Sequence, residues 1–154
     1  MAKRVVCYLA KAPDQGILYP TNNSLVLKAY GDADWGTCPT SRRSVTGFVT
    51  FLGVAPLTWR SKKQPTVSLS SAEAEYRAMA KTTKEIIWLI HLLEDIFVEV
   101  PKPVNLLCDN KSAIHIATNP VFHERTKHIE LDCHFIREKV QLKVINLVHV
   151  TSTQ

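Results

Sequence analysis

The chain has 154 residues, of which 45% are hydrophobic and 21% are charged, a composition that fits one globular domain and excludes a disordered chain. Its 19 Lys and Arg exceed its 14 Asp and Glu, and its four cysteines include no Cys-x-x-Cys pair, so no disulfide framework is indicated. The longest apolar run, 86–93, is far shorter than the roughly 20 residues of a membrane span, and the N-terminus lacks a secretory pattern, so we expect an intracellular protein that is not secreted and has no membrane partner.

The first part of the chain indicates a short helix followed by three strands. Residues 1–11 show the helical spacing of apolar side chains and precede a turn-forming cluster. Residues that favour β-structure then predict strands over 25–32 and 45–52, and a third strand over 57–60 that resumes at 66–68. Because short turns join these segments, we expect an antiparallel meander.

The second part alternates between helices and strands. Apolar side chains recur at three- and four-residue spacing from residue 70 to about residue 97, which predicts a long helix with Ser70 or Ser71 as its N-cap. A strand over 104–108 follows, then a helix that Asp109-Asn110 cap and that ends near residue 118, a helix from 128 to about 140, and a strand over 144–150. The chain is therefore expected to be an α/β protein.

Three acidic motifs lie where these predicted elements begin or end. They are the string DAD at 32–34, the string EAE at 73–75 and Asp109. Carboxylates gathered from separate elements repel one another unless cations lie between them, and hard oxygen ligands suit Mg²⁺ or Mn²⁺. Two such ions, about 3.5–4 Å apart, can support hydrolysis of a phosphodiester. Each acid also has a structural alternative: a turn for DAD, the first helical turn for EAE and a helix cap for Asp109.

Basic residues gather in the first part of the chain. Residues 1–64 carry nine Lys and Arg against three acids, whereas residues 65–154 carry ten against eleven. A basic half favours a polyanionic partner such as nucleic acid, because Lys and Arg release the counterions that surround phosphates. A solvated basic surface explains the same imbalance equally well.

Long strings of the sequence resemble a known family. They are YGDADWGTCPTSRRSVTGFVTFLG, WRSKKQPTVSLSSAEAEYRAMA, LLCDNKSAIHIATNPVFHERTKHIELDCHFIREKV and INLVHVTSTQ. In this order they resemble the ribonuclease H domain of copia-type LTR retrotransposon polyproteins of plants. Residues 1–20 are similar to a leading helix and connection after the reverse transcriptase, and residues 21–154 are similar to the ribonuclease H-like domain.

This resemblance implies a fold, a reaction and partners. The implied fold is ribonuclease H-like, with a five-stranded mixed sheet of three antiparallel strands and two parallel additions, flanked by helices. The implied reaction is endonucleolytic cleavage of the RNA strand of an RNA–DNA hybrid during reverse transcription, with two Mg²⁺ or Mn²⁺ ions. The reverse transcriptase domain of the same polyprotein is a further expected partner. The cytoplasm, a virus-like particle and the nucleus all fit such an activity.

The family's catalytic and metal-binding acids match Asp32, Glu75 and Asp109. Asp34 lies on the same strand face as Asp32, so it remains the alternative ligand on that strand. A helical wheel places Glu75 near the apolar face of the long helix and Glu73 on its polar side. We therefore favour Glu75 as the ligand, and we expect Glu73, the alternative, to pair with the arginine four residues later.

Nucleic-acid contacts are expected from two basic pairs and two polar residues beside the acids. The pairs flank the second and third strands and suit phosphates as clusters, while the polar side chains suit ribose 2′-hydroxyls, which distinguish RNA from DNA. Solvation at the surface is the alternative for each of these residues. The residues are Arg42, Arg43, Lys62, Lys63, Ser71 and Asn110.

Two of the chain's departures from the family pattern bear on its function and on its fold. The family's fourth acid lies in a helix beyond the segment that matches HVTSTQ, and the sequence ends at Gln154, so we expect a domain without its C-terminal helix and without one metal ligand. The alternative function is therefore a catalytically impaired retroelement remnant that at most binds nucleic acid. The second departure is the string QLK at 141–143, where the family has a glycine that ends the helix.

Overall fold

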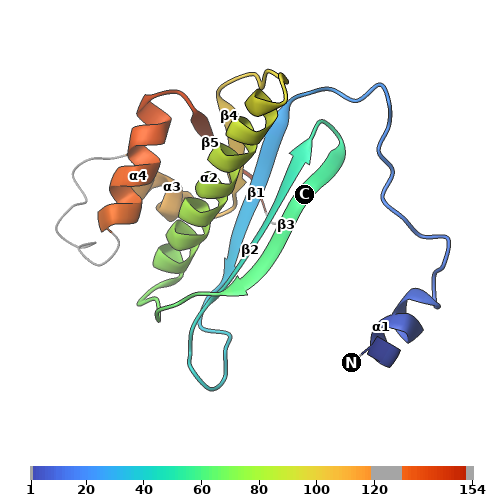
Figure 1. Ribbon diagram of the computed structural model, residues 1–154. Helices are drawn as coiled ribbons and strands as arrows, with labels where there is room; N and C mark the ends of the chain where they lie inside the picture. The colour runs from blue at the N-terminus through green and yellow to red at the C-terminus, as the bar shows by residue number, and fades with distance from the viewer. Residues whose placement is uncertain (1, 119–129, 152–154) are drawn as a thin grey trace.

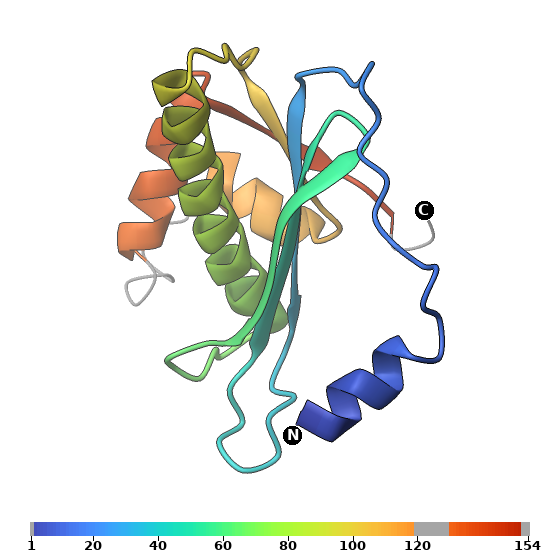
Figure 2. The same ribbon diagram turned by 45° about the vertical axis from the view of Figure 1, so that its right-hand side comes forward.

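The computed structural model describes residues 2–118 and 130–151, and its centre is a mixed β-sheet (Figures 1 and 2). The sheet has five strands in the order β3-β2-β1-β4-β5. Neighbouring strands β1, β2 and β3 are antiparallel, whereas β1–β4 and β4–β5 are parallel. The predicted α/β fold is confirmed. The strands are β1 (Leu27–Asp34), β2 (Val45–Leu52), β3 (Ala55–Lys63), β4 (Val104–Cys108) and β5 (Ile145–His149).

Helix α2 (Ser71–Asp95) is the long predicted helix, and it packs against the sheet at β1. Ser70, rather than Ser71, is its N-cap, because the Ser70 hydroxyl accepts a hydrogen bond from the backbone N–H of Glu73, at 3.1 Å. At its C-terminal end the chain turns through Phe97, whose φ is 62°. The N–H of Val98 then donates to the carbonyl of Leu93 at 2.8 Å, as in a Schellman motif.

The core lies between α2 and the helix-facing side of the sheet. Alternate residues of β1 point into it, and one of them, Gly31, lies against α2. A Cβ atom at Gly31 would lie 2.7 Å from the hydroxyl oxygen of Thr82, so a glycine is needed for this close approach. The largest fully buried side chains of the core include Leu27, Tyr76, Met79, Ile86 and Leu106.

Helices α3 (Lys111–Thr118) and α4 (Glu130–Gln141) complete the helical layer beside α2. The predicted start of the last helix at residue 128 lies outside the described residues, as do residues 152–154, where the sequence ends. Helix α4 ends in a second Schellman motif, in which Val144 donates to Lys139 at 2.9 Å and Lys143 donates to Val140 at 3.0 Å. Lys143, with φ 53°, takes the left-handed position that a glycine would occupy at lower cost.

The first helix, α1 (Ala2–Leu9), lies apart from the sheet, and none of its residues is buried (Figures 1 and 2). The observed helix is therefore slightly shorter than the helix predicted over residues 1–11. The hydroxyl of Tyr19 donates to the carbonyl oxygen of Pro56, at 2.9 Å, which ties the connecting segment to β3. Within the described ranges, the helices are too short or too polar to span a bilayer.

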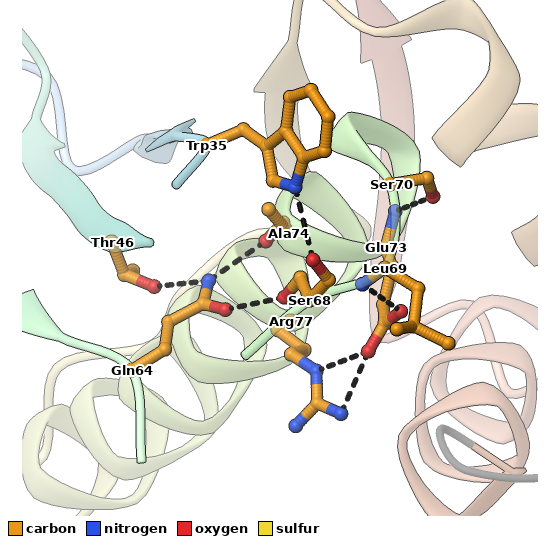
Figure 3. A network of polar contacts seen from close by, with 9 residues as sticks. All are labelled: Trp35, Thr46, Gln64, Ser68, Leu69, Ser70, Glu73, Ala74 and Arg77. Atoms are coloured by element: carbon orange, nitrogen blue, oxygen red, sulfur yellow. Dashed lines mark hydrogen bonds and ion pairs between the residues drawn. The ribbon is translucent and has the colours of Figure 1, made fainter. Parts of the chain in front are cut away.

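The predicted continuation of the third strand at 66–68 is wrong. Strand β3 is continuous to Lys63, and residues 66–68 form no strand. Hydrogen bonds of Ser68 hold the segment instead. The indole N–H of Trp35 donates to the carbonyl of Ser68 at 3.0 Å, and the Ser68 hydroxyl donates to the amide oxygen of Gln64 at 2.9 Å (Figure 3). These contacts hold the segment as an irregular connection to α2.

Candidate active site

Asp32 and Asp109 lie at the edge of the sheet where the parallel strands β1 and β4 end. The pairing of β1 with β4 ends at Tyr30 and Leu107, so each aspartate lies two residues beyond the last pair of this register. Both carboxylates are exposed, and they line the same cavity of about 320 Å³. The end of β5 adjoins this edge, because the Nε2 atom of His149 lies 3.0 Å from the backbone carbonyl oxygen of Asp109.

Glu75 reaches this edge from the first part of α2 and is buried, with 6% of its surface exposed. The backbone N–H of Ala33 donates to its Oε1 atom, at 3.2 Å. Its Oε2 atom is buried and has no hydrogen-bond partner within the part of the chain that the structure describes. Ligand atoms of Glu75, Cys108 and Asp109 lie within 4.8 Å of one another. Asp32 is not in this group of ligand atoms, but it lines a cavity with Asp109, and its charge acts on Glu75.

The charges of these acids act on one another. Burial raises the pKa of Glu75 to about 8, and the negative charge of Asp32 adds to this effect, while the N–H of Ala33 opposes it. The charge of Asp109 raises the same pKa further. A buried carboxylate next to two others is stabilised by a bound proton or by a cation. The site thus has the electrostatic character of a cation-binding site.

The donor set at this edge favours hard cations. Burial raises the pKa of the Cys108 thiol to about 11, and the backbone N–H of Asn110 contacts its sulfur at 3.4 Å. A thiol that stays protonated is a poor metal ligand, whereas carboxylate oxygens suit Mg²⁺ and Mn²⁺. The carboxylates of Asp32, Glu75 and Asp109 are therefore the groups that fit such ions.

Glu73 has a different environment from Glu75. Its Oε2 atom accepts a hydrogen bond from the backbone N–H of Leu69 at 2.8 Å, and its Oε1 atom accepts from Nε and Nη2 of Arg77 at 3.1 and 2.9 Å (Figure 3). The predicted pairing with Arg77 is confirmed. The predicted position on a polar face is wrong, because only 4% of Glu73 is exposed.

Asp34 lies two residues after Asp32 on the same exposed face of β1. It is exposed at the end of β1, and it is not among the residues that line the cavity shared by Asp32 and Asp109. The carboxylates that raise the pKa of Glu75 are those of Asp32 and Asp109. Asp34 and Glu73 thus differ in their surroundings from the favoured acids, and the choice of metal ligands stays a prediction.

The residues expected to contact nucleic acid fall in two places. Ser71 is the exposed first residue of α2, and Asn110 caps α3 by accepting a hydrogen bond from the N–H of Ala113 at 2.9 Å. Three of the four basic residues line a second cavity, of about 520 Å³, whereas Arg42 lies in a turn with φ 52°. The three are Arg43, Lys62 and Lys63.

Sequence reasoning missed two further lysines of the second cavity, Lys81 and Lys84. They lie three residues apart on α2, a spacing that is equally typical of a solvated helix face. Their approach to β3 depends on tertiary packing, so the local pattern alone carried no signal for it.

Curated relatives match nearly the whole chain. It is 45% identical over 150 residues to the retrovirus-related Pol polyprotein from transposon RE2 of Arabidopsis thaliana, which is 97% of the chain and 10% of that protein. It is 39% identical over 130 residues to the corresponding polyprotein from transposon TNT 1-94 of Nicotiana tabacum, which is 84% of the chain and 10% of that protein. The chain thus spans about a tenth of the length of these relatives. No protein-family model matches it.

Solved structures resemble the fold at low sequence identity. LC11-RNase H1 in complex with an RNA/DNA hybrid has a TM-score of 0.58 and 14% identity, over 82% of this chain and 86% of that one. The prototype foamy virus protease-reverse transcriptase has a TM-score of 0.55 and 19% identity, over 88% of this chain and 18% of that one. The predicted ribonuclease H fold is therefore confirmed.

Proposed function

Because the chain belongs to the retrovirus-related Pol polyproteins of plant transposons, as a segment with the ribonuclease H fold, we propose that it cleaves the RNA strand of RNA–DNA hybrids. The observation that carries this proposal is the buried carboxylate of Glu75 next to Asp32 and Asp109 at the edge of the sheet. The hybrid bound to LC11-RNase H1, a protein of the same fold, supports the choice of substrate.

We propose Asp32, Glu75 and Asp109 as the ligands of two Mg²⁺ or Mn²⁺ ions. The fit of such ions rests on the partnerless, buried Oε2 atom of Glu75 and on the raised pKa of this carboxyl group. When bound, the ions lower the pKa of a coordinated water and stabilise the leaving oxygen of the phosphodiester. The N–H of Ala33 orients the Glu75 carboxylate by holding its Oε1 atom, at 3.2 Å.

We propose that the substrate contacts come from two polar residues near the acids and from basic residues that line the second cavity. Ser71 and Asn110 lie at the starts of α2 and α3, beside Glu75 and Asp109 in the sequence, where they suit ribose 2′-hydroxyls. Arg43, Lys62 and Lys63 suit phosphates, because their guanidinium and ammonium groups pair with them. The reverse transcriptase segment of the same polyprotein is the proposed protein partner, in line with the polyprotein relatives.

Cleavage of an end-labelled RNA–DNA hybrid in Mg²⁺ or Mn²⁺ tests the proposal. We expect the chain to cut the RNA strand, and Asp109→Asn to reduce the rate by at least about 100-fold, because it removes a ligand charge. The matched control is Asp95→Asn, which changes an exposed aspartate at the far end of α2 and is expected to retain the rate.

Equal rates for the chain and for Asp109→Asn would overturn the proposal, since the cleavage would then not depend on the acids. Hybrid binding with no cleavage would also overturn it. That result would favour the second candidate, an impaired retroelement remnant that binds nucleic acid.

A further inference from the structure

One face of the sheet carries a row of large apolar side chains that stay partly exposed. Figure 2 shows α2 and α4 on one side of the sheet and the N-terminal segment on the other side, which we call the open face. The pairing of the strands places one residue of each strand in register across this face. From β3 to β5 this open row consists of Trp59, Val49, Tyr30, Leu107 and Val148.

The members of the open row point away from the core. Each alternates along its strand with residues that face α2, and two of these neighbours, Ala29 and Leu106, have no exposed surface. Tyr30 and Trp59, in contrast, are 37% and 61% exposed. β4 pairs in parallel with both of its neighbours, and strands in parallel pairs are normally covered on both faces. The open face therefore has the composition of a surface that another element covers.

Helix α1 has an apolar side that is likewise uncovered. Four of its large apolar residues lie within about 160° around the helix axis, and more than half of each is exposed. A helix of 8 residues is marginal in water on its own, because few hydrogen bonds offset the cost of its first turn. α1 therefore gains stability from any apolar surface on which it packs. The four residues are Val5, Val6, Tyr8 and Leu9.

The connecting segment is long enough to bring α1 to the open row. Its second part is attached to the β2–β3 hairpin, because Tyr19 donates to the carbonyl of Pro56 and the N–H of Gly53 donates to the carbonyl of Val26 at 2.8 Å. The first part, residues 10–18, can extend to about 30 Å. The most distant member of the row, on β5, lies only about 20 Å from Pro56, across four strand spacings.

The charges of the two surfaces are complementary. Lys3 and Arg4 lie in the first turn of α1, and the helix contains no acid. Asp32 and Asp34 are exposed at the end of β1, on the same face as Tyr30, because they follow it at two-residue spacing. A helix on the open row therefore brings its cations close to exposed carboxylates, and salt would weaken this attraction.

We propose that α1 docks on the open face of its own chain, with its apolar side on the open row and its first turn toward the end of β1. Docking removes apolar surface of both partners from water, which supplies the driving force. Tyr30 and Leu107 of the row also line the cavity that Asp32 and Asp109 share, so the docked helix narrows access to this cavity. The inference goes beyond the proposed function and does not depend on it, because docking involves no nucleic acid.

A nitroxide attached to Cys7 tests docking in the whole chain. Cys7 is exposed and lies on the side of α1 opposite to its apolar residues, so the label does not block the contact. Cys108 and Cys133 are buried, and Cys38→Ser removes the remaining accessible thiol. In the isotope-labelled protein the unpaired electron broadens the amide NMR signals of nearby residues. We expect broadening along the open row, compared with the same sample after reduction of the nitroxide.

Leu9→Asp is the test variant, because it places a charge in the apolar side of α1. We expect it to lower the docking equilibrium constant by about tenfold or more and thus to restore the signals of the open row. Since no residue of α1 is buried, this change leaves the folded domain intact. Trp59→Ser, on the sheet, should reduce the broadening in the same way.

Leu131→Asp is the matched control, because it makes the same change at an exposed leucine in the first turn of α4, within the helical layer. It should leave the broadening unchanged. Thermal unfolding of each variant checks that the domain remains folded.

Three outcomes would overturn the proposal. The first is an open row whose signals the nitroxide does not broaden, which would assign the apolar side of α1 to another segment of a longer polyprotein. The second is an equal effect of Leu9→Asp and Leu131→Asp. The third is broadening in an isotope-labelled chain without nitroxide after mixing with an unlabelled chain that carries one, because α1 would then dock on a second copy. None of these readouts uses cleavage, so docking and the proposed function fail separately.

Discussion

The backbone N–H of Ala33 in β1 donates a hydrogen bond to Oε1 of Glu75 in α2, with 3.2 Å between the nitrogen and the oxygen. The contact joins the strand that carries Asp32 to the helix that carries Glu75, so it holds one proposed ligand next to the strand of another. It uses only one oxygen of the carboxylate, and the other is buried without a partner in the described part of the molecule.

The first prediction concerns the stability of the metal-free protein. The folded-state pKa of Glu75 is about 8, above the ordinary value of 4.5, so this group contributes most stability at pH values below 4.5, and that contribution is lost as the pH rises through 8. Glu75→Gln mimics the protonated form. We expect it to stabilise the metal-free protein at pH 8 by about 1 kcal/mol or more, which is about 2–4 °C in Tm for a chain of this size.

Thermal unfolding in EDTA at several pH values measures this effect, which should shrink toward pH 4.5. The exposed Glu99→Gln is the control and should show little change. Added Mg²⁺ should raise the Tm of the unmodified chain more than that of Glu75→Gln, because it binds the folded state that keeps all three acids. A lower Tm for Glu75→Gln at pH 8 in EDTA would contradict the prediction.

The second prediction separates Glu73 from Glu75. Glu73→Ala removes the acceptor of the Leu69 N–H and the partner of Arg77, so we expect a loss of about 1–3 kcal/mol in the free energy of unfolding, measured in urea. Glu130→Ala, the control, removes an exposed glutamate that lies 3.8 Å from His134, and it should cost less than about 0.5 kcal/mol. Hydrolysis per folded molecule should persist in Glu73→Ala, and its complete loss without a stability change would instead place Glu73 among the ligands.

The third prediction concerns the contact between β1 and α2. Gly31→Ala would place a methyl group 2.7 Å from the Thr82 hydroxyl oxygen, so we expect a destabilisation of about 1–3 kcal/mol. Gly47→Ala is a matched control on β2, because a Cβ atom there has no neighbour within 4 Å. Urea unfolding of both variants gives the comparison, and equal stabilities would show that α2 can move away from the strand without cost.

The fourth prediction concerns the end of α4. Lys143 has φ 53°, a left-handed conformation that glycine adopts with less strain, so Lys143→Gly should stabilise the protein by about 0.5–1 kcal/mol. Leu142→Gly, at the exposed neighbouring position, should destabilise it instead, since its φ is not in the left-handed region. Differential scanning calorimetry measures the change in Tm of each variant. A lower Tm for Lys143→Gly would contradict the interpretation that the left-handed conformation of Lys143 carries strain.

Local patterns predicted the elements whose burial follows a simple period. The bounds of β2 and β4 were predicted to the residue, because turns enclose their apolar runs, and α2 was predicted because its apolar spacing continues over its whole length. The error at 66–68 arose from hydrogen bonds between residues that are far apart in the sequence. Trp35 lies 33 positions before Ser68, and no local pattern contains that contact.

The candidate site shows the same contrast between features that local patterns predict and features that depend on tertiary contacts. The family resemblance and the helical wheel together favoured Glu75, which the structure places next to Asp32 and Asp109. The wheel failed for Glu73 because it treats the helix alone, whereas the segment before α2 folds over its first turn and buries this side chain. Lys81 was missed for a similar reason, since only the packing of α2 beside β3 encloses its ammonium group.

The parallel pairing of β1 with β4 determines when the acidic edge can form during folding. β2, β3 and α2 lie between these strands in the sequence, whereas the antiparallel strands β1, β2 and β3 follow one another directly. Contacts that close a long loop carry a larger entropic cost and form more slowly than contacts between sequence neighbours. The β1–β2–β3 meander can therefore assemble while synthesis of α2 is still in progress. Asp32 and Asp109 come together only after β4 has paired with β1, so the proposed cation site can form only after that step.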